Sequence, residues 1–240
     1  MVGLCAIIGV AGSVAEAQEL PQQKFKVIGG WSNVSLTTAV EKPFWTEQLP
    51  AASNGQITAD FNSLDLLGLA GTETLRLLSM GVADFVGGPG SFVGGDFKLY
   101  DGLDLAGLII EIGTMRDAVQ AYKPVMDKNM QENFNAKLLM AWPSPPQVLY
   151  CRGKITGVAD LKGKKIRTFN QTLADFVEGV GGTPVSLSFP EVVPALERGT
   201  ADCAITGTGP GYDAKWWEVT DHLYPLVLGW APYFHAVNLD

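Results

Sequence analysis

The chain has 240 residues, of which 18% are charged, and its formal net charge is −8 at pH 7. This length allows one large domain or two small ones, with enough interior for a stable core. The acidic balance and the absence of a basic stripe argue against nucleic-acid binding and against a polybasic membrane-binding surface. We therefore expect no nucleic-acid partner.

The first 17 residues are typical of a secretory signal peptide. The apolar run Val2–Ala11 is followed by Ala15 and Ala17, which form an Ala-x-Ala cleavage pattern. The run is too short to span a bilayer as a helix, so we predict export to the periplasm and cleavage after residue 17. The cationic segment that usually opens such a leader is missing, so Met1 lies inside a longer leader or marks a trimmed sequence.

Strands and helices alternate through the first half of the chain. Short apolar runs predict strands, and apolar side chains at helical spacing predict helices. The expected strands are Lys24–Gly29, Ile57–Phe61, Ala83–Val86 and Ala136–Trp142, and the expected helices are Thr37–Gln48, Thr72–Met80 and Thr114–Phe134.

Glycine and proline interrupt this pattern at two places. We predict a loop over Gly87–Gly95, which either approaches a ligand or simply connects two elements. It lacks the Gly-Lys-Ser/Thr ending of a phosphate-binding loop. Prolines at 143, 145 and 146 break regular structure, and we interpret this segment as a crossing between two domains.

A βαβα run follows the prolines. A strand over Leu149–Arg152 comes first, and a later strand ends at Arg167 and leads into a helix. The strands Thr183–Leu187 and Asp202–Thr206 flank a helix that begins at a capping box. The alternation of strands and helices predicts the α/β class.

Arg167 is the most informative residue of this run. It lies at the carboxyl end of a strand, where open α/β sheets bind their ligands. Its guanidinium is always charged and presents a fork that matches the two oxygens of a carboxylate. We therefore predict that the protein binds a small organic acid. In the alternative interpretation, Arg167 belongs to a solvated charge run with Lys162, Lys164 and Lys165.

Two cysteines remain after removal of the leader, Cys151 and Cys203. An exported protein can join them by a disulfide, but both lie in apolar strand-like segments where free cysteine is ordinary core filling. We favour two buried thiols. A nucleophilic pair of a cysteine with His222 or His235 has no motif to support it, and no metal-ligand spacing is present.

Four segments of the chain are most informative when they are taken together. They are Trp142-Pro-x-Pro-Pro-Gln-Val-Leu149, Ala159-Asp-Leu-Lys-Gly-Lys-Lys-Ile-Arg167, Gly181-Gly-Thr-Pro-Val185 and Phe189-Pro-Glu-Val-Val-Pro-Ala-Leu-Glu-Arg-Gly-Thr-Ala-Asp202. In this succession they resemble the solute-binding proteins of tripartite ATP-independent periplasmic (TRAP) transporters. The resemblance runs from about Lys24 to Asp240 and is most specific between Leu161 and Asp202.

The resemblance implies a periplasmic-binding-protein fold with two lobes that close on a ligand. Each lobe would hold a mixed β-sheet flanked by helices, with the cleft between the lobes. We expect lobe 1 over 24–142, with 227–240 returning to it, and lobe 2 over 147–226. Family members continue for several more helices, so the chain resembles a C-terminally truncated member.

Five residues are expected at the ligand. The resemblance implies that Arg167 pairs with the ligand carboxylate, that Asn170 lines the cleft and that Phe189 packs in it. Thr206 stands where many members carry an amide, so the polar network differs here. Trp31 follows a strand at the ligand end of its sheet, and we expect it to cover the ligand. Such aromatic lining favours an acid with an apolar or aromatic body.

These expectations combine into one function. We expect a monomeric solute-binding protein without a cofactor, which captures an organic acid and delivers it to the membrane permease of a TRAP transporter. One alternative is a receptor that feeds a sensor kinase, because its binding chemistry would be identical. A second alternative is an enzyme on a similar fold, which we disfavour because the chain has only two histidines.

Overall fold

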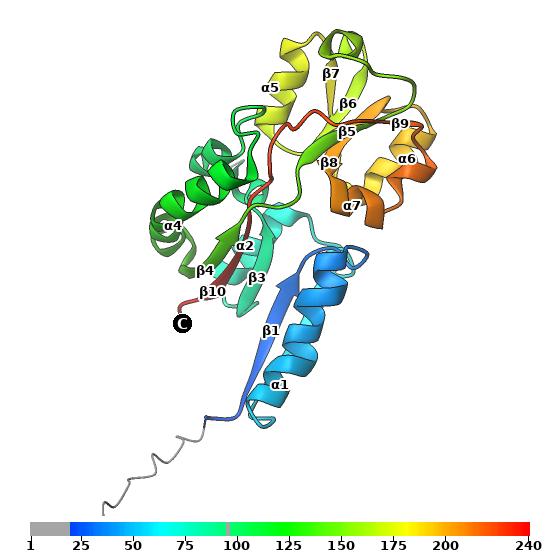
Figure 1. Cartoon of the computed structure of the whole chain (residues 1–240). Helices are drawn as coiled ribbons and strands as arrows, with labels where there is room; N and C mark the ends of the chain where they lie inside the picture. Colours follow the sequence, from blue (N-terminus) through cyan, green and yellow to red (C-terminus); the bar gives the residue numbers. More distant parts are fainter. Residues whose placement is uncertain (1–19, 95–96) are drawn as a thin grey trace, which may run out of the picture.

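The computed structural model describes residues 20–94 and 97–240. The predicted signal peptide, residues 1–17, lies outside this part of the chain. Two five-stranded sheets organise the molecule and lie at opposite ends of it (Figure 1). We call each sheet with its helices a lobe, the first lobe being the one that contains the N-terminal strand. The expectation of two lobes, each with a mixed sheet flanked by helices, is confirmed.

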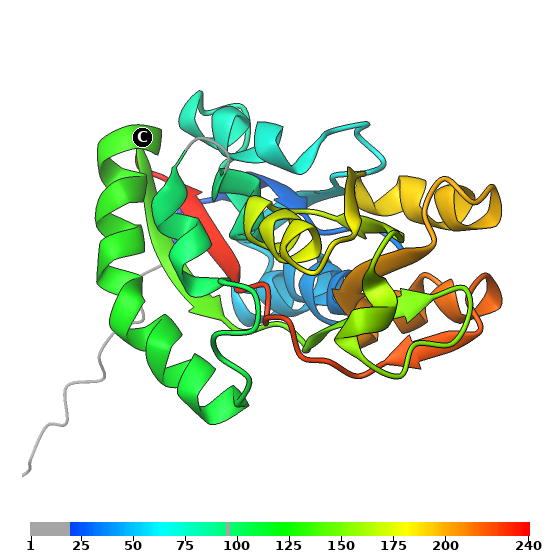
Figure 2. The same cartoon turned by 90° about the horizontal axis from the view of Figure 1, so that it is seen from above.

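The first sheet has the strand order β2-β1-β3-β10-β4, and β10 runs antiparallel to both of its neighbours. Its longest helix, α4, lies along one side of the molecule (Figure 2). The strands are β1 (Gln23–Gly29), β2 (Ile57–Ser63), β3 (Phe85–Pro89), β4 (Ala136–Trp142) and β10 (Tyr233–Asn238). The helices include α1 (Leu49–Ala52), α2 (Gly71–Ser79), α3 (Ser91–Gly94), the 3-10 helix η3 (Lys98–Leu103) and α4 (Ile112–Phe134).

The helix expected over Thr37–Gln48 is part of a longer helical segment, 35–52, with two π-helical stretches, η1 (Thr37–Glu41) and η2 (Phe44–Gln48). In each, an amide bonds to the carbonyl five residues earlier: Lys42 to Thr37 in the first and Leu49 to Phe44 in the second. Prolines at 43 and 50 lack the amide hydrogen of a regular turn, and such interruptions favour wider turns.

The loop expected over Gly87–Gly95 is wrong for most of its length. Gly87, Gly88 and Pro89 belong to β3 and pair with β10, and Ser91–Gly94 forms α3. Close packing explains the glycines: a Cβ at Gly87 would collide with the ring of His235, and one at Gly88 with the ring of Phe92. The glycines therefore leave room for neighbouring rings to pack against the strand. A local sequence pattern does not reveal this packing.

The second sheet has the strand order β7-β6-β8-β5-β9, with β5 antiparallel to β8 and β9. Its strands are β5 (Gln147–Cys151), β6 (Lys165–Thr168), β7 (Thr183–Ser186), β8 (Cys203–Gly207) and β9 (His222–Tyr224). Its helices are α5 (Gln171–Gly179), α6 (Val192–Glu197) and α7 (Thr208–Asp213), with 3-10 turns η4 (Val158–Leu161), η5 (Phe189–Glu191) and η6 (Trp216–Glu218).

The prediction of two free thiols is wrong, because Cys151 and Cys203 form a disulfide with an S–S distance of 2.07 Å. The two residues lie directly opposite each other on the antiparallel strands β5 and β8, and both are fully buried. The apolar context that suggested core filling is correct, but strand pairing over 52 residues of separation brings the two sulfurs together.

Two neighbouring segments connect the lobes. One carries the prolines between β4 and β5, and the other runs from β9 to β10 (Figure 1). They are hydrogen-bonded to each other: Ser144 N donates to Trp230 O at 2.8 Å and Gln147 N to Gly229 O at 2.9 Å. We refer to these segments, 143–147 and 228–232, as the hinge. Within the described residues, no helix is long and apolar enough to span a membrane.

Candidate ligand-binding site

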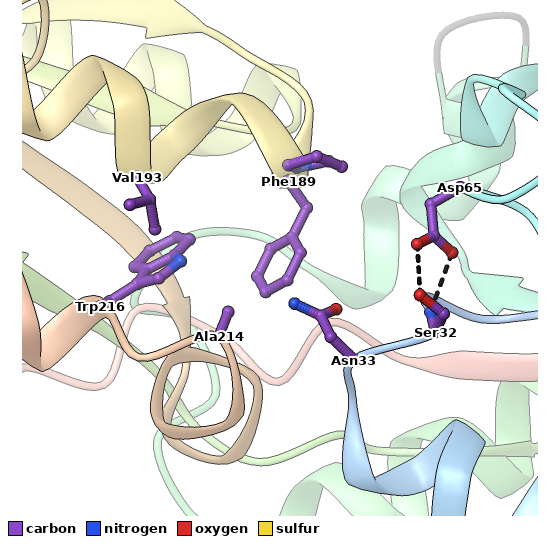
Figure 3. A pocket seen from close by; sticks show the side chains of 8 residues that line it. Ser32, Asn33, Asp65, Phe189, Val193, Ala214 and Trp216 are labelled. Carbon is purple, nitrogen blue, oxygen red and sulfur yellow. Dashed lines mark hydrogen bonds between the residues drawn. The ribbon is translucent and has the colours of Figure 1, made fainter.

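A pocket of about 210 Å³ lies between the lobes (Figure 3). The side facing the first lobe is polar and the side facing the second lobe is apolar. The first lobe contributes Ser32, Asn33 and Asp65, and the second contributes Phe189, Pro190, Val193, Ala214 and Trp216. Its volume is below the roughly 300 Å³ at which typical small-molecule pockets begin, which suits a small ligand.

The polar wall forms where two parallel strands end. Ser32 and Asn33 follow β1, and Asp65 follows the neighbouring β2, so the register that pairs Gly29 with Ser63 brings them to one edge. Asp65 accepts hydrogen bonds from the Ser32 amide at 2.9 Å and the Ser32 hydroxyl at 2.6 Å. Sequence reasoning missed these residues, although the position of Asp65 just after a predicted strand was a usable signal.

Three aromatic rings meet across the lobes. The Trp31 ring lies 5.1 Å from that of Phe189, which in turn stacks on Trp216 at 5.4 Å. Trp31 also contacts Phe92 of its own lobe at 5.6 Å. The structure therefore brings together Trp31 and Phe189, two of the predicted site residues. Trp216 is fully buried, and its indole nitrogen has no hydrogen-bond partner among the described residues.

Arg167 lies behind this aromatic wall and is 2% exposed. Its guanidinium is 5.8 Å from the Trp216 ring and 5.3 Å from the Phe169 ring. Nε donates to Leu187 O at 3.0 Å and Nη1 to Ile205 O at 2.8 Å. Arg167 forms no ion pair with any described residue, and burial lowers its pKa to about 9, although the charge of Glu191 opposes this shift.

Of the five predicted site residues, only Phe189 lines the pocket, and Asn170 and Thr206 lie outside it. Asn170 is the N-cap of α5, where its Oδ1 accepts from the Leu173 amide at 2.9 Å, and its Nδ2 donates to Asp104 Oδ2 at 2.9 Å. Thr206 is 5% exposed on β8, next to Ile205, and its hydroxyl makes no hydrogen bond within the described part of the chain. The roles expected for both residues at the ligand stay predictions.

Asp104 connects both lobes with the hinge. Besides the Asn170 amide, its carboxylate accepts from the backbone of Ala231 at 3.0 Å and of Trp230 at 3.3 Å, and its carbonyl accepts from Thr172 at 2.6 Å. Burial raises the pKa of the Asp104 carboxyl to about 6, although the bonds from Ala231, Trp230 and Asn170 oppose the shift. Such a contact can form only where the two lobes meet beside the hinge.

A second buried carboxylate, Glu41, supports the loop that carries Trp31. It accepts hydrogen bonds from the Gly30 amide at 3.0 Å, from His235 at 2.8 Å and from Tyr233 at 3.2 Å. Burial alone would raise its pKa, but the bonds from His235 and Gly30 outweigh burial and hold the pKa below its usual value. The charged form is therefore stabilised at the end of β1.

Residues 20–94 and 97–240 contain no group of three or more histidine, cysteine, aspartate or glutamate side chains arranged to hold a metal ion. What the site offers instead is a buried cation, three aromatic rings and a polar loop with a carboxylate. This combination can bind a small anionic molecule with an apolar body.

Several solved structures share this fold at low sequence identity. DctP6 of Bordetella pertussis, a solute receptor that binds pyroglutamic acid, superposes with a TM-score of 0.83 and 21% identity, over 90% of this chain and 71% of its own. A TRAP solute-binding protein from a marine metagenome, in complex with 3-hydroxybenzoate, gives a TM-score of 0.79 and 22% identity, over 91% of this chain and 69% of its own. A TRAP periplasmic solute-binding protein from Sulfurospirillum deleyianum with bound succinate gives a TM-score of 0.79 and 21% identity, over 92% of this chain and 71% of its own.

No curated protein matches the chain. Residues 34–240, by contrast, match the family described as bacterial extracellular solute-binding protein, family 7 (DctP). The match covers most of the chain and both lobes, and the resemblance to TRAP solute-binding proteins is thereby confirmed. The chain belongs to bacterial extracellular solute-binding protein family 7.

Proposed function

We propose that this protein is a periplasmic receptor that captures a small carboxylic acid with an apolar or aromatic body and delivers it to the permease subunits of a TRAP transporter. The observation that carries this proposal is the state of Arg167, a buried guanidinium without a carboxylate partner among the described residues. A buried charge that lacks its counter-ion is expensive, and a bound carboxylate would supply one.

The hydrogen-bond geometry of Arg167 supports this role. Its two bonds to backbone carbonyls use Nε and one hydrogen of Nη1, and they hold the guanidinium in place. Both hydrogens of Nη2 and the second hydrogen of Nη1 remain for a ligand. These hydrogens form the end of the guanidinium fork, which pairs with both oxygens of a carboxylate.

The remaining wall determines the body of the acid. Phe189, Trp216 and Val193 offer apolar surface, and Trp31 of the first lobe covers it. Aromatic and planar bodies pack well on such rings. The relatives that bind pyroglutamate and 3-hydroxybenzoate are consistent with a small ring-bearing acid.

Ligand entry requires the lobes to separate, because the rings of Trp31, Phe189 and Trp216 cover Arg167. The lobes would open about the hinge, and binding would shift the equilibrium to the closed form. The Thr206 hydroxyl makes no hydrogen bond within the described residues and directly follows Ile205, whose carbonyl accepts from Arg167, while Asn170 keeps one amide hydrogen, so we propose both as additional ligand contacts. The receptor acts as a monomer and catalyses no reaction on its ligand.

A thermal-shift series tests the proposal. The panel contains pyroglutamate, 3-hydroxybenzoate and succinate, each beside its amide, with wild type and Arg167→Met in parallel. A ligand that binds the folded chain alone raises the melting temperature. We expect shifts with acids, none with amides and none with the variant. An equal response of the variant would remove Arg167 from the site, and a larger shift with succinate than with 3-hydroxybenzoate would contradict the apolar body.

A further inference from the structure

The carboxylate of Asp213 in the second lobe binds the first residue of a helix in the first lobe. The amide of Ser35 donates to Asp213 Oδ2 at 2.7 Å, and the hydroxyl of Ser35 donates to Asp213 Oδ1 at 2.7 Å. Ser35 begins the helical segment 35–52, and Asp213 ends α7. We call this pair of hydrogen bonds the Asp213–Ser35 clasp.

The chemistry of the clasp is that of a helix cap. The first amides of a helix have no partner inside the helix and carry partial positive charge, so a carboxylate that accepts from them is stabilising. Such caps normally come from a residue just before the helix. Here the cap comes from 178 residues away and from the other lobe. It can therefore exist only while the two lobes are in contact.

The two residues of the clasp are each next in sequence to a residue that packs at or lines the pocket. Val34, which precedes Ser35, is 7% exposed and packs into a cluster of second-lobe side chains that includes Phe189 and Trp216. Ala214, which follows Asp213, lines the pocket. A movement of the lobes that breaks the clasp therefore also moves Val34 of the first lobe and Ala214 of the second lobe.

No neighbouring cation competes for Asp213 in the described structure. Lys215, two residues away, pairs with Glu218 at 3.4 Å instead. Both oxygens of the Asp213 carboxylate are engaged by Ser35, each by one donor. The carboxylate thus makes both of its side-chain hydrogen bonds across the lobe boundary and none within its own lobe.

We propose that Asp213 is a positioning residue that holds the closed lobes over the ligand and sets the rate of ligand release. This inference rests on the proposed function, because it requires a ligand in the closed cleft. Opening breaks the clasp and leaves the start of the helix without its cap. Release is therefore slower than the contacts between ligand and pocket alone would allow.

Release rates provide the first test. The probe is whichever of pyroglutamate, 3-hydroxybenzoate and succinate gives the largest thermal shift, displaced in a stopped-flow experiment with tryptophan fluorescence as the readout. Loss of a helix cap typically lowers stability enough to change an equilibrium by about fivefold to tenfold. We expect Asp213→Ala to release the acid that much faster, with an association rate within about twofold of wild type.

Two further variants separate the clasp from a general charge effect. Ser35→Ala removes one of the two bonds, so it should accelerate release less, and it should add nothing in the Asp213→Ala background. Glu197→Gln removes an acidic group from an exposed position of α6 in the same lobe and should release at the wild-type rate. Unchanged release from Asp213→Ala, or additive effects of the two clasp variants, would overturn the proposal.

Hydrogen exchange tests whether the clasp forms in the absence of a ligand. In wild type, the Ser35 amide is bonded to Asp213, so peptides covering residues 31–40 should take up deuterium more slowly than in Asp213→Ala, with Glu197→Gln like wild type. Equal uptake in wild type and Asp213→Ala would show that the clasp does not form. If no acid binds wild type while the exchange difference is present, the proposed function fails, and the role in release fails with it.

Discussion

Replacement of Arg167 by methionine separates a ligand-binding arginine from a structural one. Methionine keeps an unbranched, flexible stem of similar path but removes the charge and all five donors. In the ligand-free protein, Arg167 is a buried cation that donates to two backbone carbonyls and pairs with no acid among the described residues. The substitution therefore has two opposite effects on folding and one effect on binding.

The two folding effects nearly cancel. Burial lowers the pKa of Arg167 from its ordinary value to about 9, and this difference corresponds to about 5 kcal/mol of unfavourable free energy at neutral pH, which the variant would relieve. The carbonyls of Leu187 and Ile205 would lose their donor, at about 1–3 kcal/mol each. The net change in the free energy of unfolding should therefore lie between about 3 kcal/mol of stabilisation and about 1 kcal/mol of destabilisation.

Binding has no such compensation. Truncation of one partner of a buried charge pair typically costs about 2–5 kcal/mol, which is roughly a 30-fold to 5,000-fold loss of affinity. Arg167→Lys should also bind poorly, because a single ammonium cannot reproduce the fork or its two bonds to Leu187 and Ile205. Both variants should thus bind the acid much more weakly than wild type, and Arg167→Met should still fold.

Urea unfolding of the ligand-free chain and isothermal titration with the acid selected by thermal shift measure the two quantities separately. Arg152→Met is the matched control, because Arg152 directly follows β5 of the same lobe and bonds to the Leu196 carbonyl at 2.8 Å, but the residue is exposed. It should leave affinity unchanged. A destabilisation of Arg167→Met by more than about 4 kcal/mol together with retained affinity would refute the reasoning, because Arg167 would then be a structural residue.

Asp104 and the Cys151–Cys203 disulfide give two further predictions, both about the free energy of unfolding. The folded-state pKa of Asp104, about 6, lies above the ordinary value of 3.8, so the favourable contribution of its protonated form is present at low pH and is lost as the pH rises through 6. Between pH 4 and pH 7, the free energy of unfolding measured in urea should fall by about 2–3 kcal/mol more in wild type than in Asp104→Asn. A difference between the two proteins that stays constant over this pH range would show that Asp104 titrates normally. The Cys151–Cys203 bridge closes a loop of 52 residues, so Cys151→Ala/Cys203→Ala should lower the free energy of unfolding by about 2–5 kcal/mol. Mass spectrometry of a digest prepared without reductant should find the two cysteine peptides linked, and two separate free-thiol peptides would contradict the bridge.

Local patterns predicted the elements of this fold well, because they depend on near neighbours in the sequence. The amphipathic spacing before Phe134 gave α4, and the capping box at Ser188 gave the start of the helix after β7, where Ser188 N donates to Glu191 at 2.9 Å. The position of Arg167 at the end of β6 was predicted for the same reason. Each of these features is determined by residues within about one or two turns.

The failures share a different cause, since each depends on which strands become neighbours. The disulfide requires that β5 pair with β8, and the strand through Gly87 requires that β10 supply His235 beside it. The meeting of Ser32 with Asp65 requires that β1 pair with β2 in parallel. Strand order is a property of the whole chain, and hydrophobic periodicity does not contain it.

On the proposed function, ligand recognition and lobe closure depend on different residues of this protein, and the two inter-lobe carboxylates are Asp104 and Asp213. The second lobe holds Arg167 and the apolar wall, while the first lobe contributes the polar loop and Trp31. Asp104 reaches from the first lobe to α5 and also binds the hinge backbone, whereas Asp213 reaches from the second lobe to the helix that follows the polar loop. Neither carboxylate lines the pocket, so the contacts of both favour closure whichever acid is bound. On the proposed function, affinity for a particular acid is then set by Arg167 and the aromatic wall, and the lifetime of the closed state is set by residues that a change of ligand specificity would leave intact.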